Sequence, residues 1–362
     1  MRIYDLPTPA ALVDLDILQR NIQSMADAAR RAGVRLRPHV KTHKMHAIAR
    51  MQLEAGAVGL TCAKVSEAEV MAASGARDIL IAYPVVGDWQ IERIVRLARR
   101  VQVTVAFDSE FAARKLNEAA RDAGLVLPLY LIVDTGNRRD GVLPGEPALQ
   151  LAKKVAALPH VRLAGIMTHE GHVGRARDEE ELKAAVAAAA RDMVATAALL
   201  RESGIEVEQV SVGSTPACKS GIVIDGITEW RPGTYVFNDV NELSRGTPLE
   251  NCALSILATV VSHSAIDRAV IDAGSKTLTS EPARRGGAGF GYIKEWPKAV
   301  LERLYEEHGV VQLNGEACEI GQRVTIIPNH VCPVVNLMEH VYVTRGDEVI
   351  DQWPVDARGK IQ

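Results

Sequence analysis

Lysines and histidines gather in one short basic segment near the N-terminus, "RLRPHVKTHKMHAIARMQLEAG" (35–56). The segment contains Lys41 and Lys44 together with three histidines. Residues of these types can hold the phosphates of a nucleic acid, coordinate a metal, or provide one shielded lysine for covalent chemistry. The rest of the sequence must decide among these three kinds of site.

The overall charge of the chain argues against a nucleic-acid site. The 362 residues carry a net charge of −3, and only 4% of them are aromatic. Nucleic-acid binding needs a broad basic surface, and binding of single strands also needs aromatic side chains on which bases stack. The basic segment is therefore a local excess of charge that suits a small anionic ligand, and we expect no nucleic-acid partner.

The cysteines indicate neither a disulfide framework nor a structural zinc site. There are five of them, widely scattered and without a CxxC pair. The N-terminal sequence "MRIYDLPTPAALVDLD" has no apolar signal core, and no apolar run is long enough to span a bilayer. We therefore expect a reduced, cytoplasmic protein without a membrane partner.

Short apolar runs alternate with helix-like runs over residues 14–245. Segments such as 109–124 and 178–204 begin at Ser or Asp and end at Gly, as helix caps require. Eight strands, each followed by a helix or crossover, predict a (β/α)8 TIM-like barrel. An open doubly wound sheet is the alternative, although no GxGxxG motif follows the first strand. The expected strands are 36–40, 57–61, 79–83, 101–107, 127–133, 162–167, 208–212 and 229–237.

The pattern changes after about residue 246. Helical periodicity fades over 246–362, and runs such as "ALSILATVVSHSA" and "HVYVTRGDEVID" have the alternation of antiparallel strands with turns that contain Gly. We expect a C-terminal, mostly antiparallel β domain there. The apolar run near the N-terminus could pair with it, so residues 1–13 are assigned to the same domain.

Polar residues follow the expected barrel strands, where the active site of this fold lies. "GSTP" (213–216) and "RPGTY" (231–235) place Gly beside Ser or Thr after the last two strands, which suits binding of a phosphate by backbone N–H groups. Two ordinary tight turns are the alternative. A lysine after the first strand, Lys41, that faces a phosphate site would suggest pyridoxal 5′-phosphate (PLP), whose Schiff-base lysine must be partly shielded from water. A plain surface lysine is the alternative for Lys41.

Motifs along nearly the whole chain resemble those of the D-threonine aldolase and D-serine dehydratase family. In "TPAALVDLD" this chain carries one extra alanine. The resemblance implies a PLP barrel of the alanine-racemase type followed by a C-terminal β domain. The motifs are "TPAALVDLD", "LRPHVKTHK", "GLTCAKVSEAE", "VDTGNRRDGV", "AGIMTHEGH", "RPGTYVFND", "VIDAGSKT" and "PNHVCPVVNL".

The resemblance also implies roles for individual residues. Lys41 matches the lysine that binds PLP, and His39 is expected beside it. Arg139 of "TGNRRDG" matches an arginine on the cofactor side, with Arg138 as the alternative if the register slips. His169 of "THEG" matches a histidine near the cofactor ring with a catalytic role. The phosphate-binding loops match Gly213, Ser214, Thr215, Gly233, Thr234 and Tyr235.

His330 and Cys332 of "PNHVC" match the residues that bind a divalent metal in this family. They are two residues apart, so in an extended segment their side chains would point to the same face. Imidazole and thiolate suit Zn²⁺, and two protein ligands would leave positions open for water or substrate. A buried cysteine beside a hydrogen-bonded histidine, with no metal, is the alternative.

The resemblance implies a lyase that acts on D-3-hydroxy amino acids with PLP and a divalent metal, Zn²⁺ or Mn²⁺. D-threonine aldolase is the main hypothesis. A D-serine or D-threonine dehydratase is the alternative, because Cys332 stands where an aldolase of the family carries Asp and the eukaryotic dehydratases carry Cys. A non-catalytic PLP carrier is a further alternative, which the second domain and the metal motif argue against. We expect a homodimer by analogy with PLP barrels of this type.

Overall fold

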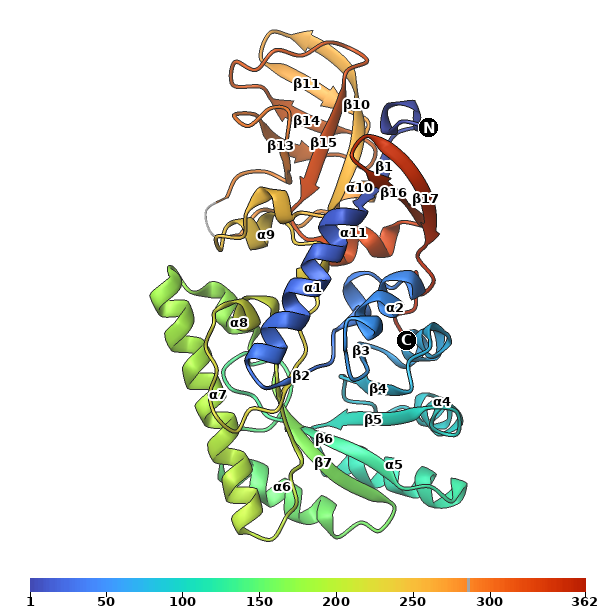
Figure 1. Ribbon diagram of the computed structural model, residues 1–362, viewed down its shortest axis with the longest axis vertical. Helices are drawn as coiled ribbons and strands as arrows, with labels where there is room; N and C mark the ends of the chain where they lie inside the picture. The colour runs from blue at the N-terminus through green and yellow to red at the C-terminus, as the bar shows by residue number, and fades with distance from the viewer. Residues whose placement is uncertain (285–286) are drawn as a thin grey trace. The chain divides into compact units, whose positions relative to one another are not determined.

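A computed structural model describes residues 1–284 and 287–362. The chain forms two compact units, and Figure 1 labels many of their helices and strands. The first unit consists of Met1–Ser24, Thr42–Met45 and Thr234–Gly359, and the second consists of Met25–Lys41, His46–Gly233 and Lys360–Gln362. The domain boundary expected between residues 245 and 246 stays a prediction.

The second unit contains eight parallel strands. They are hydrogen-bonded in the order β2, β9, β8, β7, β6, β5, β4, β3, so each strand from β3 to β9 lies beside its neighbour in the sequence. The strands are β2 (Arg35–Leu36), β3 (Leu60–Cys62), β4 (Asp78–Ile81), β5 (Gln102–Phe107), β6 (Leu127–Ile132), β7 (Val161–Met167), β8 (Gln209–Val212) and β9 (Glu229–Trp230).

Backbone contacts join the two strands at the ends of this order. The N–H of Thr61 in β3 donates to the carbonyl of Pro38 at 2.8 Å, and His39 forms a parallel bridge with Thr61. The segment that follows β2 is thereby linked to β3, which leaves no open edge there. The expected TIM-like barrel is therefore confirmed, and the alternative of an open sheet is not supported.

Helices follow the strands of this unit, as the alternating pattern predicted. Ser109 caps α5 by accepting from the N–H of Ala112, and Gly124 ends it at a φ of 68°. Asp178 caps α7 in the same way by accepting from Glu181. The helices are α2 (His46–Glu54), α3 (Val65–Met71), α4 (Asp88–Ala98), α5 (Glu110–Ala123), α6 (Glu146–Ala156), α7 (Glu179–Glu202) and α8 (Thr215–Lys219), with short 3-10 helices η2 (Val40–Thr42), η3 (Ala72–Ser74) and η4 (Gly171–Arg175).

The eighth barrel strand is much shorter than expected. The sequence predicted residues 229–237, but β9 ends at Trp230. Pro232 has no N–H to continue the strand pairing, and a 3-10 helix, η5 (Thr234–Val236), follows.

The first unit is built on a mostly antiparallel, nine-stranded sheet. Its main order is β13, β14, β11, β10, β1, β16, β17, and β15 pairs with β10 and β12. The N-terminal strand β1 (Ala10–Asp14) lies antiparallel to β10 and parallel to β16. The other strands are β10 (Leu254–Ala265), β11 (Arg268–Ile271), β12 (Gly291–Ile293), β13 (Val300–Leu304), β14 (Gly309–Gln312), β15 (Arg323–Pro328), β16 (His340–Arg345) and β17 (Glu348–Pro354).

Short helices connect the strands of the first unit: η1 (Ile3–Asp5), α9 (Val240–Leu243), η6 (Leu249–Asn251), α10 (Ser275–Leu278) and α11 (Val331–Leu337). The longer α1 (Leu15–Arg31) runs from the first unit into the second. Among the residues that the structure describes, no helix has the length and apolar character needed to cross a membrane.

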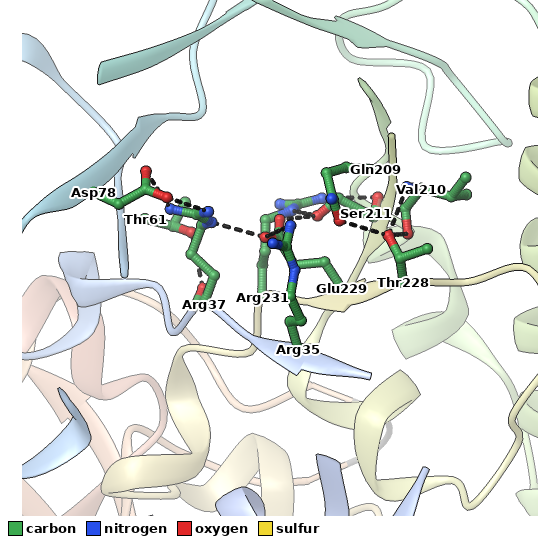
Figure 2. Close-up of polar contacts among 10 residues, drawn as sticks. All are labelled: Arg35, Arg37, Thr61, Asp78, Gln209, Val210, Ser211, Thr228, Glu229 and Arg231. Atoms are coloured by element: carbon green, nitrogen blue, oxygen red, sulfur yellow. Dashed lines mark hydrogen bonds and ion pairs between the residues drawn. The ribbon is translucent and has the colours of Figure 1, made fainter. Parts of the chain in front are cut away.

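A buried network of charged and polar groups connects the barrel strands across β2, β4, β8 and β9 (Figure 2). Arg37 donates to Glu229 Oε2 at 2.8 Å and to Asp78 Oδ2 at 2.8 Å. Ser211 donates to Glu229 Oε1 at 2.7 Å and accepts from Arg231 Nε at 2.7 Å. Burial opposes the charge of Arg37, but Glu229 and Asp78 more than offset it and raise its pKa. These residues come from four separate segments of the sequence, so the network fixes how the strands are placed.

Removing Arg37 is therefore expected to destabilise the fold strongly. Arg37→Ala leaves the fully buried Glu229 without its main partner, and the expected loss is about 3–5 kcal/mol in the free energy of unfolding. Arg35→Ala is the matched control, because Arg35 lies 3.6 Å from the same carboxylate but its side chain is 43% exposed. That change should cost at most about 1 kcal/mol. Urea unfolding of both variants makes the comparison, and equal losses would contradict the role given to Arg37.

Candidate active site

A cavity of about 390 Å³ lies in the second unit, beyond the carboxyl ends of the barrel strands. Its walls come from segments that follow β2, β3, β4, β6, β7 and β9, which is where TIM-barrel enzymes hold their active sites. Its volume falls within the range of small-ligand pockets. The lining residues are His39, Lys41, Ala63, Ala82, Tyr83, Pro84, Arg139, Asp140, Met167, His169 and Arg231.

Lys41 reaches this cavity from η2, directly after the short first barrel strand. The Lys41 side chain is half-buried, as covalent use of its amine requires. His39 precedes it, and its Nδ1 accepts a 3.4 Å hydrogen bond from the N–H of Lys41. Burial, together with the charges of Lys41 and Arg231, holds the pKa of His39 well below its usual range. The imidazole is therefore neutral, with its proton on Nε2.

His169 follows β7 and lines the same cavity. Burial, followed by the positive charges of Lys41, Arg139 and Arg231, lowers the pKa of His169 to about 3. A hydrogen bond to the backbone of Gly213 opposes this shift. Because the ring is neutral, one of its two nitrogens is a proton acceptor.

Arg139 lies on a loop that is organised by Asp134. The N–H groups of Gly136 and Arg138 donate to the Asp134 carboxylate at 3.0 Å. Burial alone would raise the pKa of Asp134, but these N–H bonds hold it below its ordinary value. Arg139 lines the cavity and pairs with Asp140 at 3.0 Å. Arg138, the alternative in the sequence, is not among the residues that line it.

Arg231 also lines the cavity, although no sequence motif predicted a role for it. It is the first residue after β9, and its side chain is almost fully buried. Besides Ser211, its guanidinium donates to the carbonyl of Thr168. Its position directly after a barrel strand was the signal that could have identified it. Tyr83 after β4 has the same signal, and the ammonium of Lys64 lies 3.6 Å from the centre of its ring.

The first predicted phosphate loop lies between β8 and α8. Gly213 has a φ of +142°, and a Cβ added there would lie 2.4 Å from the backbone nitrogen of Arg231, so only glycine fits. Ser214 is the N-cap of α8 and accepts from Ala217. The second predicted loop is divided between the units: Gly233 belongs to the barrel, whereas Thr234 and the buried Tyr235 belong to the first unit.

The two predicted metal ligands lie in the first unit. His330 Nδ1 lies 2.8 Å from Glu281 Oε2, its ring also forms a hydrogen bond with Cys332, and Cys332 Sγ donates to Thr42 Oγ1 at 3.3 Å. The expectation that both lie on one extended segment is wrong: His330 is the N-cap of α11, and Cys332 lies in the first helical turn. The two side chains still meet, because the chain turns between them.

The residues present fit both groups that the sequence implies. The cavity brings together an amine, two guanidinium groups and two imidazoles with only one acid, Asp140, so an anionic cofactor such as PLP would offset its excess positive charge. At His330, a carboxylate held by Nδ1 leaves Nε2 for a metal, which is the usual arrangement around a metal-binding histidine. Within 1–284 and 287–362, no group of three or more His, Cys, Asp or Glu side chains is arranged to hold a metal. Solvent or substrate would have to supply the remaining ligands.

Comparison with known proteins identifies the family. The profile of the family "Alanine racemase, N-terminal domain" matches residues 13–240, and that of the "Putative serine dehydratase domain" matches residues 253–344. The chain belongs to the alanine-racemase-type family of PLP-dependent enzymes. This confirms the resemblance described above.

Relatives over the full length of the chain define the enzyme class. A D-threonine aldolase from Arthrobacter sp is 36% identical, over 97% of this chain and 93% of its own length. A D-threo-3-hydroxyaspartate dehydratase from Delftia sp. (strain HT23) is 35% identical, over 97% of both chains. The family member described here is accordingly a PLP-dependent lyase, which excludes the non-catalytic carrier.

Solved structures of relatives share the fold of this chain. The crystal structure of D-threonine aldolase from Filomicrobium marinum has a TM-score of 0.92 at 36% identity, covering 100% of this chain and 98% of the other. A D-threo-3-hydroxyaspartate dehydratase with a cysteine-to-alanine substitution, in the metal-free form, has a TM-score of 0.91 at 32% identity and covers 98% of both chains.

The low pKa of His169 predicts that this ring stays neutral in mildly acidic solution. An ordinary histidine is protonated below about pH 6.5. Because the pKa of His169 in the folded state is depressed, the unfolded chain binds the proton first, and stability falls as the pH drops from about 6.5 towards 3. NMR titration of the ring in the cofactor-free protein, assigned with a His169→Gln variant, should find no protonation above about pH 5. A midpoint near 6.5 would contradict the burial and charge argument.

Proposed function

We propose that this chain is a D-threonine aldolase, which uses PLP and a divalent metal to cleave D-3-hydroxy amino acids into glycine and an aldehyde. One observation carries the proposal: the half-buried Lys41 shares its cavity with two arginines and two neutral histidines. The chain that holds this cavity is 36% identical to a D-threonine aldolase. The expected homodimer and the cytoplasmic location stay predictions.

In this proposal the cavity residues hold the cofactor. Lys41 would bind it covalently through its amine, and Arg139 would supply positive charge beside it. Gly213, Ser214, Thr215, Gly233, Thr234 and Tyr235 are the residues predicted for its phosphate, although the N–H groups of Gly213 and Ser214 donate to Glu170. When bound, PLP supplies an electron sink for the electron pair released at the substrate Cα.

Proton transfer falls to His169 in the proposal. The neutral ring of His169 would accept the proton of the substrate β-hydroxyl, which the retro-aldol cleavage of the Cα–Cβ bond requires. A pKa near 3, set first by burial and then by the nearby cations, makes a weak base, and a bound anion would offset the part of the shift that the cations cause and so raise the pKa. The cavity charge and the basicity of His169 are therefore linked.

The metal would be held by His330 and Cys332, with Glu281 orienting the imidazole. Bound there, Zn²⁺ or Mn²⁺ supplies Lewis-acid polarisation of a substrate oxygen.

A dehydratase is the second candidate, and one observation favours it. The Delftia dehydratase is nearly as similar to this chain as the Arthrobacter aldolase, over the same share of the chain. In that reaction the amine of Lys41 would take the α-proton, and the β-hydroxyl would leave as water. The same side chains serve both outcomes, so the products must decide.

Lys41→Ala is expected to abolish both cofactor attachment and catalysis. The visible absorbance band of bound PLP should disappear, and kcat/KM should fall by about 10³-fold or more, since the covalent anchor is lost. Lys153→Ala, which changes an exposed lysine on α6, is the matched control and should leave both unchanged. An intact absorbance band in Lys41→Ala would refute the assignment.

The products formed from D-threonine and D-serine distinguish the two lyases. With PLP and Zn²⁺ or Mn²⁺ present, an aldolase releases glycine and acetaldehyde from D-threonine. A dehydratase would instead release ammonia with 2-oxobutanoate from D-threonine or with pyruvate from D-serine. We expect glycine and acetaldehyde, and ammonia with the oxo acid as the main products would favour the second candidate.

Removal of the metal tests the role of His330 and Cys332. Chelator treatment, His330→Ala and Cys332→Ala should each reduce turnover by at least about tenfold, while the absorbance of bound PLP persists. Added Zn²⁺ or Mn²⁺ should restore the chelated enzyme but not the variants. Full turnover by the metal-free protein would be inconsistent with the metal site.

A further inference from the structure

Two adjacent residues after β7 contact the backbone of Gly213. The ring of His169 forms a hydrogen bond with it. Glu170 accepts the N–H of Gly213 at Oε2, 3.2 Å away, and the N–H of Ser214 at Oε1, 3.0 Å away. Both oxygens of one carboxylate are thus committed to consecutive backbone N–H groups.

The burial of Glu170 makes this contact strong. The side chain is only 2% exposed, so the charge-assisted hydrogen bonds form in a medium of low dielectric. Burial lowers the pKa of Arg231, and the negative charge of Glu170 is among those that oppose this shift. Loss of the carboxylate would leave two backbone donors and a buried cation less well compensated.

The loop has little room to adjust on its other side. Gly213 packs so closely on Arg231 that a Cβ would overlap the backbone nitrogen, and that nitrogen donates to the carbonyl of Val212 at 2.9 Å. Backbone pairing between β8 and β9 therefore fixes one side of the loop, and Glu170 fixes the side that carries the N–H groups.

We propose that Glu170 is a positioning residue that clamps the Gly213–Ser214 loop and thereby sets the orientation of His169 in the cavity. The carboxylate holds the N–H groups of Gly213 and Ser214, and His169 directly precedes Glu170 in the chain, so a fixed Glu170 also limits how the ring of His169 is placed. The proposal rests on the proposed function only for the identity of the ligand, PLP.

The clamp assigns the N–H groups of Gly213 and Ser214 to Glu170 and not to the phosphate of the cofactor. A carboxylate that merely occupied a phosphate site would compete with that phosphate, so its removal would strengthen phosphate binding. A clamp has the opposite effect, since its removal lets the loop and His169 move. The two roles therefore predict changes of opposite sign in the affinity for PLP.

The test compares Glu170→Gln, Glu170→Asp and the wild type. Apoenzyme is titrated with PLP and followed by absorbance, with inorganic phosphate as a competitor. We expect the Kd for PLP to rise about tenfold in Glu170→Gln, as for the loss of a charged hydrogen bond, and to a smaller extent in Glu170→Asp, which keeps the charge. Glu180→Gln, the same change at an exposed position on α7, is the control and should bind as the wild type does.

A second readout follows the ring of His169 directly. The ¹⁵N chemical shifts of this imidazole in the unliganded chain report its tautomer, and Glu170→Gln should shift them while Glu180→Gln does not. Tighter binding of PLP or phosphate by Glu170→Gln, or unchanged affinity and ring shifts, would overturn the proposal. If a thermal unfolding experiment shows that Glu170→Gln is not folded, the same comparison is made with Glu170→Asp. A wild type that fails to bind PLP would instead refute the cofactor assignment, and the ring shifts would still test the clamp.

Discussion

The barrel depends on a buried charge balance between Arg37, Glu229 and Asp78. Burial of any one of these charges alone would be costly, so each requires the others and the strands that carry them. Ser211 extends the balance to Arg231, which points to the cavity. The interaction that fixes the strand arrangement therefore also fixes a cation of the candidate active site. Stability and ligand binding share one set of contacts.

The electrostatics of the cavity follow from that arrangement. The whole chain is slightly acidic, yet the cavity collects Lys41, Arg139 and Arg231 against a single acid. Burial, and then these positive charges, lower the pKa of His39 and His169, so both rings are neutral. The result is a site that attracts an anion and offers neutral imidazoles as proton acceptors. Those two properties are what a PLP-dependent lyase needs from its protein.

Small backbone features are as important here as the reactive side chains. Gly213 directly follows β8 and packs against the backbone of Arg231 after β9, because it lacks the side chain that would collide there. His169 and Glu170 both bind to its peptide groups. A residue without chemistry of its own thus connects the proton acceptor of the cavity to the buried network behind it.

The sequence alone determined the features that depend on neighbours along the chain. The alternating apolar runs predicted the barrel strands, and Ser109 and Gly124 marked the ends of a helix, because strand periodicity and helix capping are local. Position after a strand also predicted that Lys41 and His169 lie at the rim. Only the tertiary structure decided which arginine of "NRRD" lines the cavity, that "NHVC" turns into a helix, and that Arg231 and Glu170 join the site. Those contacts join residues that lie far apart in the sequence or depend on how a turn is packed. The contacts of Arg231 and Glu170 form only when the barrel strands pack together, so no local pattern encodes them.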